Sequence, residues 1–320
     1  MKPRIAITLG DPAGIGPEIV AKALKDPRVR LACEPVVAGR RARVPMGSPS
    51  RPAGLSAIQA LNEGLSLIRS GSVRALVTAP VSKESFLLAD FGFPGHTEWL
   101  ASACRTQEVA MLMVAGPLRA ILMTRHVPLA EVSKHLTKDV IIRSAHLGYS
   151  FLRDVTPAGR KPGPSGSGLR KDTGSRLTIR RDDGKHNPRL VLCGLNPHAG
   201  DHGIIGNEEQ TIFLSALRAL QKKGISIAGP LPADSVFPLL AKGQFDLALA
   251  AYHDQGMIPL KLYAPERVVN VTLGLPFIRT SPGHGTAYDI AGRGQADARP
   301  MVEAILLAAR YSQAEERKSG

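Results

Sequence analysis

The sequence predicts an α/β protein with a mainly parallel sheet, and three observations support this fold class. Short aliphatic runs alternate with windows of helical periodicity along almost all of the 320 residues, which is the order expected when helices connect parallel strands. The runs are bounded by glycine, proline or polar residues, as buried strands of a parallel sheet are. Hydrophobic residues make up 43% of the chain and aromatic residues only 4%, so we expect a large aliphatic core.

Each aliphatic run is short and ends at a turn signal, so we expect a strand rather than a helix in each. In order along the chain, the expected strands are residues 4–9, 35–38, 75–79, 110–114, 120–124, 190–195, 247–251 and 268–273.

Helices are expected between these strands. In one window Phe213, Leu217 and Leu220 fall on a single helical face, acidic residues open the helix, and Lys222, Lys223 and a glycine close it, as the helix dipole and the usual C-terminal signals favour. The expected helices are residues 17–24, 55–70, 129–135, 138–153, 208–223 and 301–312.

Hydropathy and cysteine content favour a cytoplasmic protein. About two ordinary domains fit in 320 residues. No window approaches the roughly 20 apolar residues of a membrane helix, and the first residues lack the apolar core of a signal peptide. The three cysteines, Cys33, Cys104 and Cys193, are too few and too scattered for a disulfide framework, so we expect free thiols.

The net charge of +14 suggests anionic partners. Much of the excess lies between Arg153 and Arg189, which hold ten Lys and Arg against four Asp around a Pro-Gly-Ser stretch. We expect a flexible, solvated insertion at about 156–188. Aromatic residues that would stack on bases are absent from it, so we expect neither nucleic-acid nor membrane binding.

Three histidines carry the clearest chemical signal. His126, His198 and His253 each follow an aliphatic run and lie in a polar loop that contains glycine or proline. Ligands of open α/β sheets bind at the carboxyl ends of the strands, so three imidazoles delivered there could share one divalent metal ion. The alternative is that each is a surface residue or a hydrogen-bonding partner, and spacing alone does not decide because no HExxH or CxxC motif is present.

Two further loops are candidates for ligand contacts. The segment Gly10–Glu18 follows a strand and opens a helix, but it is not the GxGxxG dinucleotide motif, and simple loop-to-helix packing explains it equally well. Gly95–Glu98 combines an imidazole, a hydroxyl and a carboxylate that could bind a polar substrate, although Thr97 and Glu98 could also cap the following helix.

Cationic and amide side chains follow His253 at regular spacing. Lys261, Asn270 and Arg279 are nine residues apart, and lysine and arginine are the residues that bind phosphate or carboxylate groups. On a chain this basic, ordinary surface charges are the alternative.

The segment His284–Gly294, with the sequence HGTAYDIAGRG, resembles the adenosine-side cofactor loop of the isopropylmalate and isocitrate dehydrogenases. Those enzymes bind a dinucleotide without the GxGxxG motif. A glycine-rich turn before the last helix is the alternative.

Taken together, seven segments resemble the 4-hydroxythreonine-4-phosphate dehydrogenase family of vitamin B6 biosynthesis and span nearly the whole chain in that family's order. They are Gly10–Glu18, Thr78–Lys83, Gly95–Glu98, Cys193–Gly200, Gly229–Asp234, Tyr252–Gly256 and Gly274–Ser281.

The resemblance implies two α/β/α domains of the isocitrate and isopropylmalate dehydrogenase kind, with the active site in a cleft between them and shared across a homodimer. We assign residues 1–125 with 264–320 to a cofactor-side domain and 126–263 to a metal and dimerisation domain. His126, His198 and His253 would hold the metal, one of them from the other subunit. The implied substrate-binding residues are His96, Thr97, Lys261, Asn270, Arg279 and Asp234, and the implied cofactor-binding residues are Gly274, His284, Gly285, Thr286, Ala287 and Asp289.

The reaction implied is oxidation of a phosphorylated 3-hydroxy-2-amino acid by NAD or NADP, followed by loss of CO2, with one divalent ion (Zn, Mg or Co) assisting. Lys261 and Asp254 are the candidates for catalysis, although Lys261 serves equally well as an anion anchor. A related dehydrogenase of D-threonate or D-erythronate 4-phosphate is the nearest alternative, and a binding protein without catalysis is the other. The sequence departs from the family in a short segment at Arg40–Arg51 and in the insertion at 156–188.

Overall fold

The computed structural model describes residues 2–40, 42–155 and 187–319. It divides into two compact units, Met1–Val109 with Ala264–Gly320 and Ala110–Tyr263. Residues 110–125 therefore group with the second unit, whereas the sequence placed them with the first; the division at 263/264 is the same in both. The expected insertion lies almost entirely outside the described residues.

Five strands form the sheet of the first unit, in the order β2-β1-β3-β10-β9. Neighbouring strands are parallel except β9 and β10, which form an antiparallel pair with Arg279 opposite Thr272. The strands are β1 (Arg4–Thr8), β2 (Glu34–Ala38), β3 (Ala75–Thr78), β9 (Val268–Leu273) and β10 (Ile278–Pro282).

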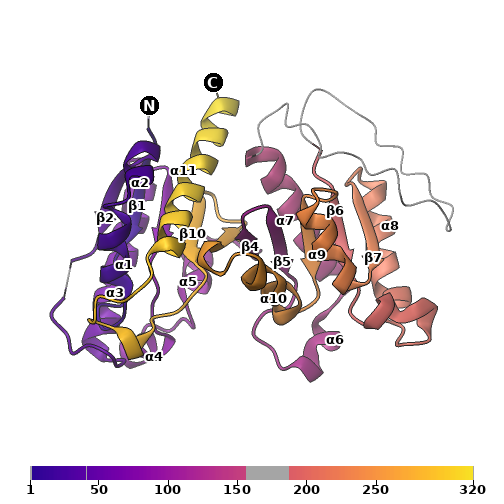
Figure 1. Ribbon diagram of the computed structural model, residues 1–320, viewed down its shortest axis with the longest axis horizontal. Helices are drawn as coiled ribbons and strands as arrows, with labels where there is room; N and C mark the ends of the chain where they lie inside the picture. Colours follow the sequence, from indigo (N-terminus) through magenta and orange to yellow (C-terminus); the bar gives the residue numbers. More distant parts are fainter. Residues whose placement is uncertain (1, 41, 156–186, 320) are drawn as a thin grey trace. The chain divides into compact units, whose positions relative to one another are not determined.

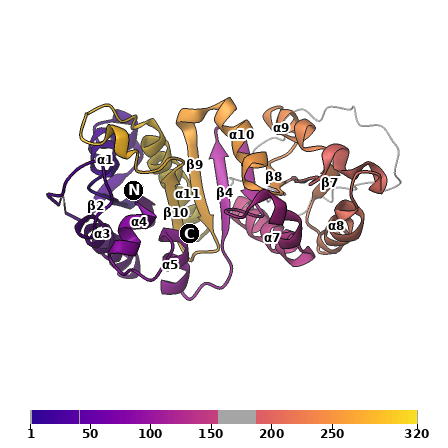
Figure 2. The same cartoon turned by 90° about the horizontal axis from the view of Figure 1, so that it is seen from below.

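Helices cover both faces of these strands. Figure 2 shows α1 and α11 on one side and α3, α4 and α5 on the other. Small residues allow close packing: a Cβ at Gly64 of α3 would lie 2.8 Å from a methyl group of Leu76 in β3. The helices are α1 (Gly16–Ala23), α2 (Pro27–Ala32), α3 (Arg51–Arg69), α4 (Lys83–Leu88), α5 (His96–Ala103) and α11 (Arg299–Ser319), with short 3-10 turns η4 (Pro265–Arg267) and η5 (Tyr288–Ile290).

The second unit has its own five strands, in the order β4-β5-β8-β6-β7. β4 and β5 form an antiparallel hairpin, and β5, β8, β6 and β7 run parallel to one another. The strands are β4 (Ala110–Ala115), β5 (Leu118–Leu122), β6 (Leu190–Cys193), β7 (Ile227–Leu231) and β8 (Leu247–Ala250).

This unit is also layered, with α9 and α10 on one face of the strands and α7 and α8 on the other (Figures 1 and 2). β5, β6 and β8 are almost completely buried and aliphatic, as strands covered on both faces are. The helices are α6 (Val132–His135), α7 (Lys138–Val155), α8 (Leu214–Lys222), α9 (Ala233–Ala241) and α10 (His253–Tyr263), with shorter turns η1 (Leu129–Glu131), η2 (Pro197–Gly203) and η3 (Glu209–Phe213, a π-helical turn).

The predicted α/β class with α/β/α layering is confirmed, and the eight expected strands are all present. Two strands were missed: β7 contains glycine and proline, and β10 (Ile-Arg-Thr-Ser-Pro) is largely polar. α9 and α10 were missed because each contains an internal proline, Pro238 and Pro259, which normally argues against a helix. Within the described residues, no helix is both long and apolar enough to span a membrane.

Candidate functional site

The three histidines that the sequence analysis singled out lie in the second unit, and they follow three adjacent parallel strands. β8 pairs with β5 on one side and with β6 on the other. His126 lies in the loop after β5, His253 opens α10 after β8, and His198 lies in η2 after β6. The carboxyl ends of these strands form one edge of the sheet, where the ligand sites of such folds lie.

His126 and His253 are close together, with 6.0 Å between their ring centroids. The Nδ1 atom of His253 lies 2.6 Å from Oδ1 of Asp254. A carboxylate can only accept, so Nδ1 carries the proton and Nε2 keeps its lone pair. Imidazole nitrogens with a free lone pair suit zinc or cobalt. No group of three His, Cys, Asp or Glu in the described part of this single chain gathers closely enough to hold an ion, so His198 does not complete the pair within one chain.

Asp254 and Lys261 lie seven residues apart on α10, which places both on one helical face about 10 Å apart along the axis. Both side chains are exposed. Lys261 lies in the last turn of this helix. Asp234 is exposed in the first turn of α9.

Arg279 of β10 is the most unusual polar residue of the first unit. It is only 2% exposed, and it is among the largest fully buried side chains. Nη1 donates to the hydroxyl of Thr272 at 2.8 Å and Nη2 donates to the hydroxyl of Thr78 at 2.6 Å. Burial lowers the pKa of Arg279 to about 10, with Glu98 acting in the opposite direction. The guanidinium is therefore still charged at neutral pH.

His96, at the start of α5, completes this cluster. Its Nδ1 lies 3.4 Å from Nη2 of Arg279, and burial together with the arginine charge lowers the pKa of His96 well below its usual value. Arginine can only donate, so Nδ1 is the acceptor and the proton of the neutral ring lies on Nε2.

Three buried polar atoms around this cluster have no hydrogen-bonding partner among the described residues: Nε2 of His96, Nε of Arg279 and Oδ1 of Asn270. Asn270 and Thr272 are two residues apart on β9, so their side chains share a face of the sheet. Buried donors without partners are costly. Two unpaired N–H groups, one on a buried cation and one beside it, are therefore suited to an anionic group of a ligand. Thr97 follows His96 in the first turn of α5.

The segment expected to bind the cofactor is attached to the N-terminal glycine-rich loop. Ile15 N–H donates to the carbonyl of Thr286 at 3.0 Å. The buried carboxylate of Asp11 accepts from the hydroxyls of Tyr288 at 2.7 Å and Ser85 at 2.8 Å. Burial raises the pKa of Tyr288, which keeps its hydroxyl protonated and able to donate.

His284, Gly285, Ala287 and Asp289 lie along this same loop, and Gly285 and Asp289 are exposed. Gly274 is not part of it. The turn that contains Gly274 lies at the other end of β10 from His284, a separation of about 16 Å for a five-residue strand.

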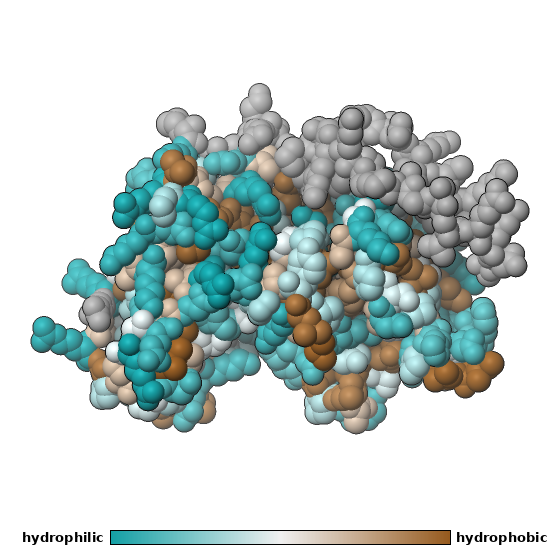
Figure 3. Space-filling view, viewed as in Figure 1, coloured by the Kyte–Doolittle hydropathy of each residue, from teal (hydrophilic) through white to brown (hydrophobic). Residues whose placement is uncertain are grey.

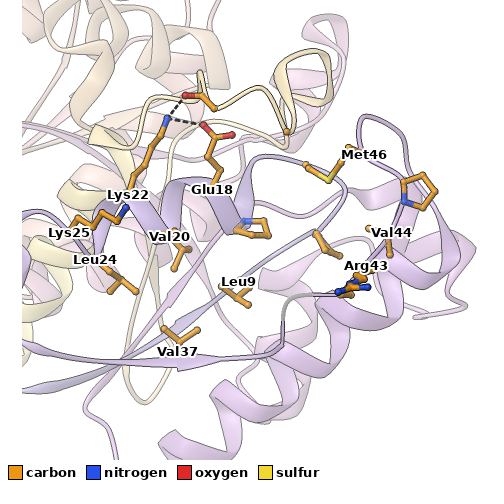
Figure 4. A pocket seen from close by; sticks show the side chains of 18 residues that line it. Leu9, Glu18, Val20, Lys22, Leu24, Lys25, Val37, Arg43, Val44 and Met46 are labelled. Carbon is orange, nitrogen blue, oxygen red and sulfur yellow. Dashed lines mark hydrogen bonds and ion pairs between the residues drawn. The ribbon is translucent and has the colours of Figure 1, made fainter.

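A groove of about 1120 Å³ lies beside this loop in the same unit. Its walls combine aliphatic residues of β2 and α1, and Leu9 directly after β1, with the loop glycines Gly292 and Gly294. In Figure 4, Lys22 reaches across to Glu18 and to the backbone of the glycine loop. Lys25 and Arg43 add positive charge to the lining.

Several residues that shape these sites were not found from sequence. Thr78 and Thr272, which hold Arg279, lie in ordinary-looking strands. Tyr288 was quoted only as part of a motif. Glu209 was interpreted only as an acidic residue at a helix start, yet it is 1% exposed. Thr78 stands at the end of an aliphatic strand and opens the family segment Thr78–Lys83, and these two signals could have found it.

Comparison with known proteins matches these features to one family. The family model described as "Pyridoxal phosphate biosynthetic protein PdxA" matches residues 18–159 and 175–308, which leaves 160–174 of the expected insertion unmatched. A 4-hydroxythreonine-4-phosphate dehydrogenase of Desulforapulum autotrophicum is 36% identical over 96% of this chain and 95% of its own length. A D-threonate 4-phosphate dehydrogenase of Cupriavidus necator is 35% identical over 95% of each chain.

Solved structures agree with this assignment. The crystal structure of 4-hydroxythreonine-4-phosphate dehydrogenase from Klebsiella pneumoniae superposes with a TM-score of 0.80 at 32% identity and covers 98% of this chain and 99% of its own. A terephthalate 1,2-cis-dihydrodiol dehydrogenase from Burkholderia xenovorans has a TM-score of 0.63 at 26% identity, with 96% of this chain covered and 98% of that one. With a family model over most of the chain and relatives above 30% identity over nearly all of it, the chain belongs to the PdxA family of pyridoxal phosphate biosynthetic proteins.

Proposed function

We propose that this chain is a metal-dependent dehydrogenase that uses NAD to oxidise 4-phosphohydroxy-L-threonine, with loss of CO2, to 3-amino-2-oxopropyl phosphate in pyridoxal phosphate biosynthesis. The observation that carries the proposal is the buried Arg279 cluster, because a fully buried cation with unpaired N–H donors around it requires an anionic ligand. The relatives from Desulforapulum autotrophicum and Cupriavidus necator are named as dehydrogenases of phosphorylated substrates, which supports this proposal.

In this proposal the substrate's anionic end binds at Arg279, with Nε2–H of His96 and the Thr97 hydroxyl as further donors. The Asn270 amide orients a neighbouring hydroxyl or amine through its unpaired Oδ1. Charge-assisted bonds to arginine are short and directional, so the cluster would hold the substrate in one orientation. Lys261 and Asp234 are proposed to contact the remaining polar groups of the substrate.

His126, His198 and His253 are proposed to hold the divalent ion, with His198 supplied by a second subunit. A zinc, cobalt or magnesium ion at this position would lower the pKa of the substrate hydroxyl and stabilise negative charge on its oxygen. Asp254 orients His253 by accepting a hydrogen bond from its Nδ1–H. Lys261 is proposed to transfer a proton near the reacting carbon, with anchoring of the anionic group as its alternative role.

The loop His284–Asp289 is proposed to bind the adenosine side of the dinucleotide, which accepts hydride from the substrate. Its attachment through Tyr288 and Asp11 supports this role, because a fixed loop loses less entropy when the ligand binds. We propose NAD rather than NADP. Lys25 and Arg43 in the neighbouring groove are the groups that a 2′-phosphate would use, so both cofactors belong in the assay.

We also propose a cytoplasmic homodimer that forms through the second unit. Several large apolar side chains are exposed there, among them Ile204 and Leu262, each 81% exposed, and Leu129 at 70%. Figure 3 shows hydrophobic groups that interrupt the mostly hydrophilic face in view. Exposed apolar residues of this size favour burial against a partner. Sedimentation equilibrium tests the assembly state; a monomer at micromolar concentration would contradict it.

The test of activity is NADH formation, followed by absorbance, with 4-phosphohydroxy-L-threonine, D-threonate 4-phosphate and D-erythronate 4-phosphate, each with and without chelator. Chelator-sensitive turnover of the amino acid phosphate supports the proposal. Preference for D-threonate 4-phosphate would favour the second candidate function, that of a D-threonate 4-phosphate dehydrogenase. The 35% identity with the Cupriavidus necator relative of that name supports this candidate. Turnover of none of the three would refute both.

A further inference from the structure

Glu209 is a buried carboxylate whose partners all belong to the strand end that precedes His198. Its Oε1 accepts from the backbone N–H groups of Leu195 and Asn196, each at 2.8 Å. Its Oε2 accepts from Nδ2 of Asn196 at 2.9 Å. These are three neutral donors around a side chain that is only 1% exposed. Burying a carboxylate is costly unless hydrogen bonds compensate for the lost water, so the arrangement depends on all three.

The chain that follows these contacts has a backbone conformation that ordinary residues avoid. Six consecutive residues, 198–203, have positive φ, among them His198 at 52° and Asp201 at 40°. Only Gly200 and Gly203 of the six are glycines, and each other residue costs about 1–2 kcal/mol in this conformation. A left-handed turn of this length persists only where its surroundings hold it in place.

Glu209 lies directly under this turn. A Cβ atom at Gly200 would lie 2.7 Å from Oε2 of Glu209, and one at Gly194 would lie 2.8 Å from the backbone of Ala199. Gln255, two residues after His253, donates to the carbonyl of Gly194 at 2.8 Å. The same short segment is therefore held from below by Glu209 and from the side by the helix that begins with His253.

We propose that Glu209 is a positioning residue: it fixes the left-handed turn that carries His198, so that this imidazole is presented in one orientation before any ligand binds. The expected effect on metal binding rests on the proposed role of His198. The stabilisation of the left-handed turn by Glu209 does not depend on that role.

The experiment compares the full-length wild type with Glu209→Gln, Glu209→Ala and a control, Glu208→Gln. Glu208 also accepts from Nδ2 of Asn196, at 2.8 Å, but its backbone donor is the N–H of Asn207, at 3.1 Å, rather than Leu195 or Asn196. Two quantities are measured on each folded protein: Co²⁺ affinity, by equilibrium dialysis and by the visible absorption of the bound ion, and hydrogen exchange of the peptide covering residues 195–203. Thermal unfolding in chelator reports global stability.

We expect Glu209→Ala to weaken Co²⁺ binding about 10- to 100-fold, the range found when groups that orient metal ligands are removed, and to speed exchange in residues 195–203. Glu209→Gln keeps one acceptor oxygen for the two backbone N–H groups but turns a donor toward Asn196, so we expect an intermediate loss. Glu208→Gln should stay within about twofold of wild type in affinity. If Glu209→Ala does not fold, the Co²⁺ affinity and hydrogen exchange of Glu209→Gln test the proposal.

The outcomes separate the two levels of the argument. A wild type that binds no Co²⁺ would refute the proposed metal site, and exchange at residues 195–203 would still test the hold on the turn. A lower melting temperature with unchanged Co²⁺ affinity and unchanged exchange in the Gln variant would mean that Glu209 only stabilises the fold, and it would overturn the positioning role.

Discussion

Replacing Arg279 separates a ligand-binding role from a structural one, because the two roles predict opposite balances of stability and affinity. In Arg279→Met the new side chain is similar in length and uncharged. Burial lowers the pKa of Arg279 from 12.5 to about 10, which at about 1.4 kcal/mol per pKa unit means that burial of the charge costs the folded protein about 3 kcal/mol at pH 7. The substitution removes that cost.

The same substitution also removes the hydrogen bonds to Thr78 and Thr272. Bonds from a charged donor contribute about 1.5–3 kcal/mol each, so the two together contribute about 3–6 kcal/mol and the net loss of stability is about 0–3 kcal/mol. We expect the ligand-free variant to unfold within a few degrees of the wild type. Binding of the substrate's anionic end should fall by about 2–5 kcal/mol, an increase of about thirtyfold to several thousandfold in the Michaelis constant.

The assay is thermal unfolding with increasing inorganic phosphate, followed by steady-state kinetics with the phosphorylated substrate. The wild type should be stabilised by phosphate and Arg279→Met should not. Arg30→Met, which changes an exposed arginine of α2, is the control and should behave as the wild type. A variant that melts many degrees lower but keeps its response to phosphate would show that Arg279 serves the fold and that the anion binds elsewhere.

Three further predictions use the other clusters. Burial and Arg279 lower the pKa of His96, so as the pH falls the unfolded chain binds this proton before the folded protein does. The free energy of unfolding of the wild type should therefore fall, relative to His96→Gln, by about 1.4 kcal/mol per pH unit below about pH 6.5. If urea denaturation showed the same pH dependence for both proteins between pH 7 and 5, this prediction would be wrong. Tyr288→Phe removes the donor to Asp11 and should raise the Michaelis constant for the dinucleotide about five- to tenfold, roughly 1–1.4 kcal/mol, with kcat unchanged; an equal loss of kcat would point to a role in the chemical step. His198→Ala should abolish chelator-sensitive turnover and leave circular dichroism unchanged, whereas full activity without bound metal would remove His198 from the site.

Local patterns in the sequence predicted the α/β fold class, which the structure confirms. The same kind of pattern singled out the candidate site residues, whose roles stay predictions. Eight aliphatic runs such as Leu247–Ala250 are strands. A strand that is buried on both faces is aliphatic along its whole length, so it can be predicted without knowing which strands pair with it. Polar residues at the ends of such runs, His126 and His253 among them, are recognisable in the same way. α10 was not predicted because it contains an internal proline, which by local rules argues against a helix. The packing around α10 overrides that local preference.

Neighbourhood in space was decided only by the tertiary structure. No local pattern shows that β8 lies between β5 and β6, or that Thr78 and Thr272, almost two hundred residues apart in sequence, hold the same guanidinium. Nor does the sequence show that Glu209 is buried beneath the His198 turn, because the cost of burying a carboxylate is met by backbone N–H groups that every sequence contains. The sequence determines which chemical groups are present and which local elements form. Burial, charge balance and hydrogen-bond partners are determined only when distant segments pack together.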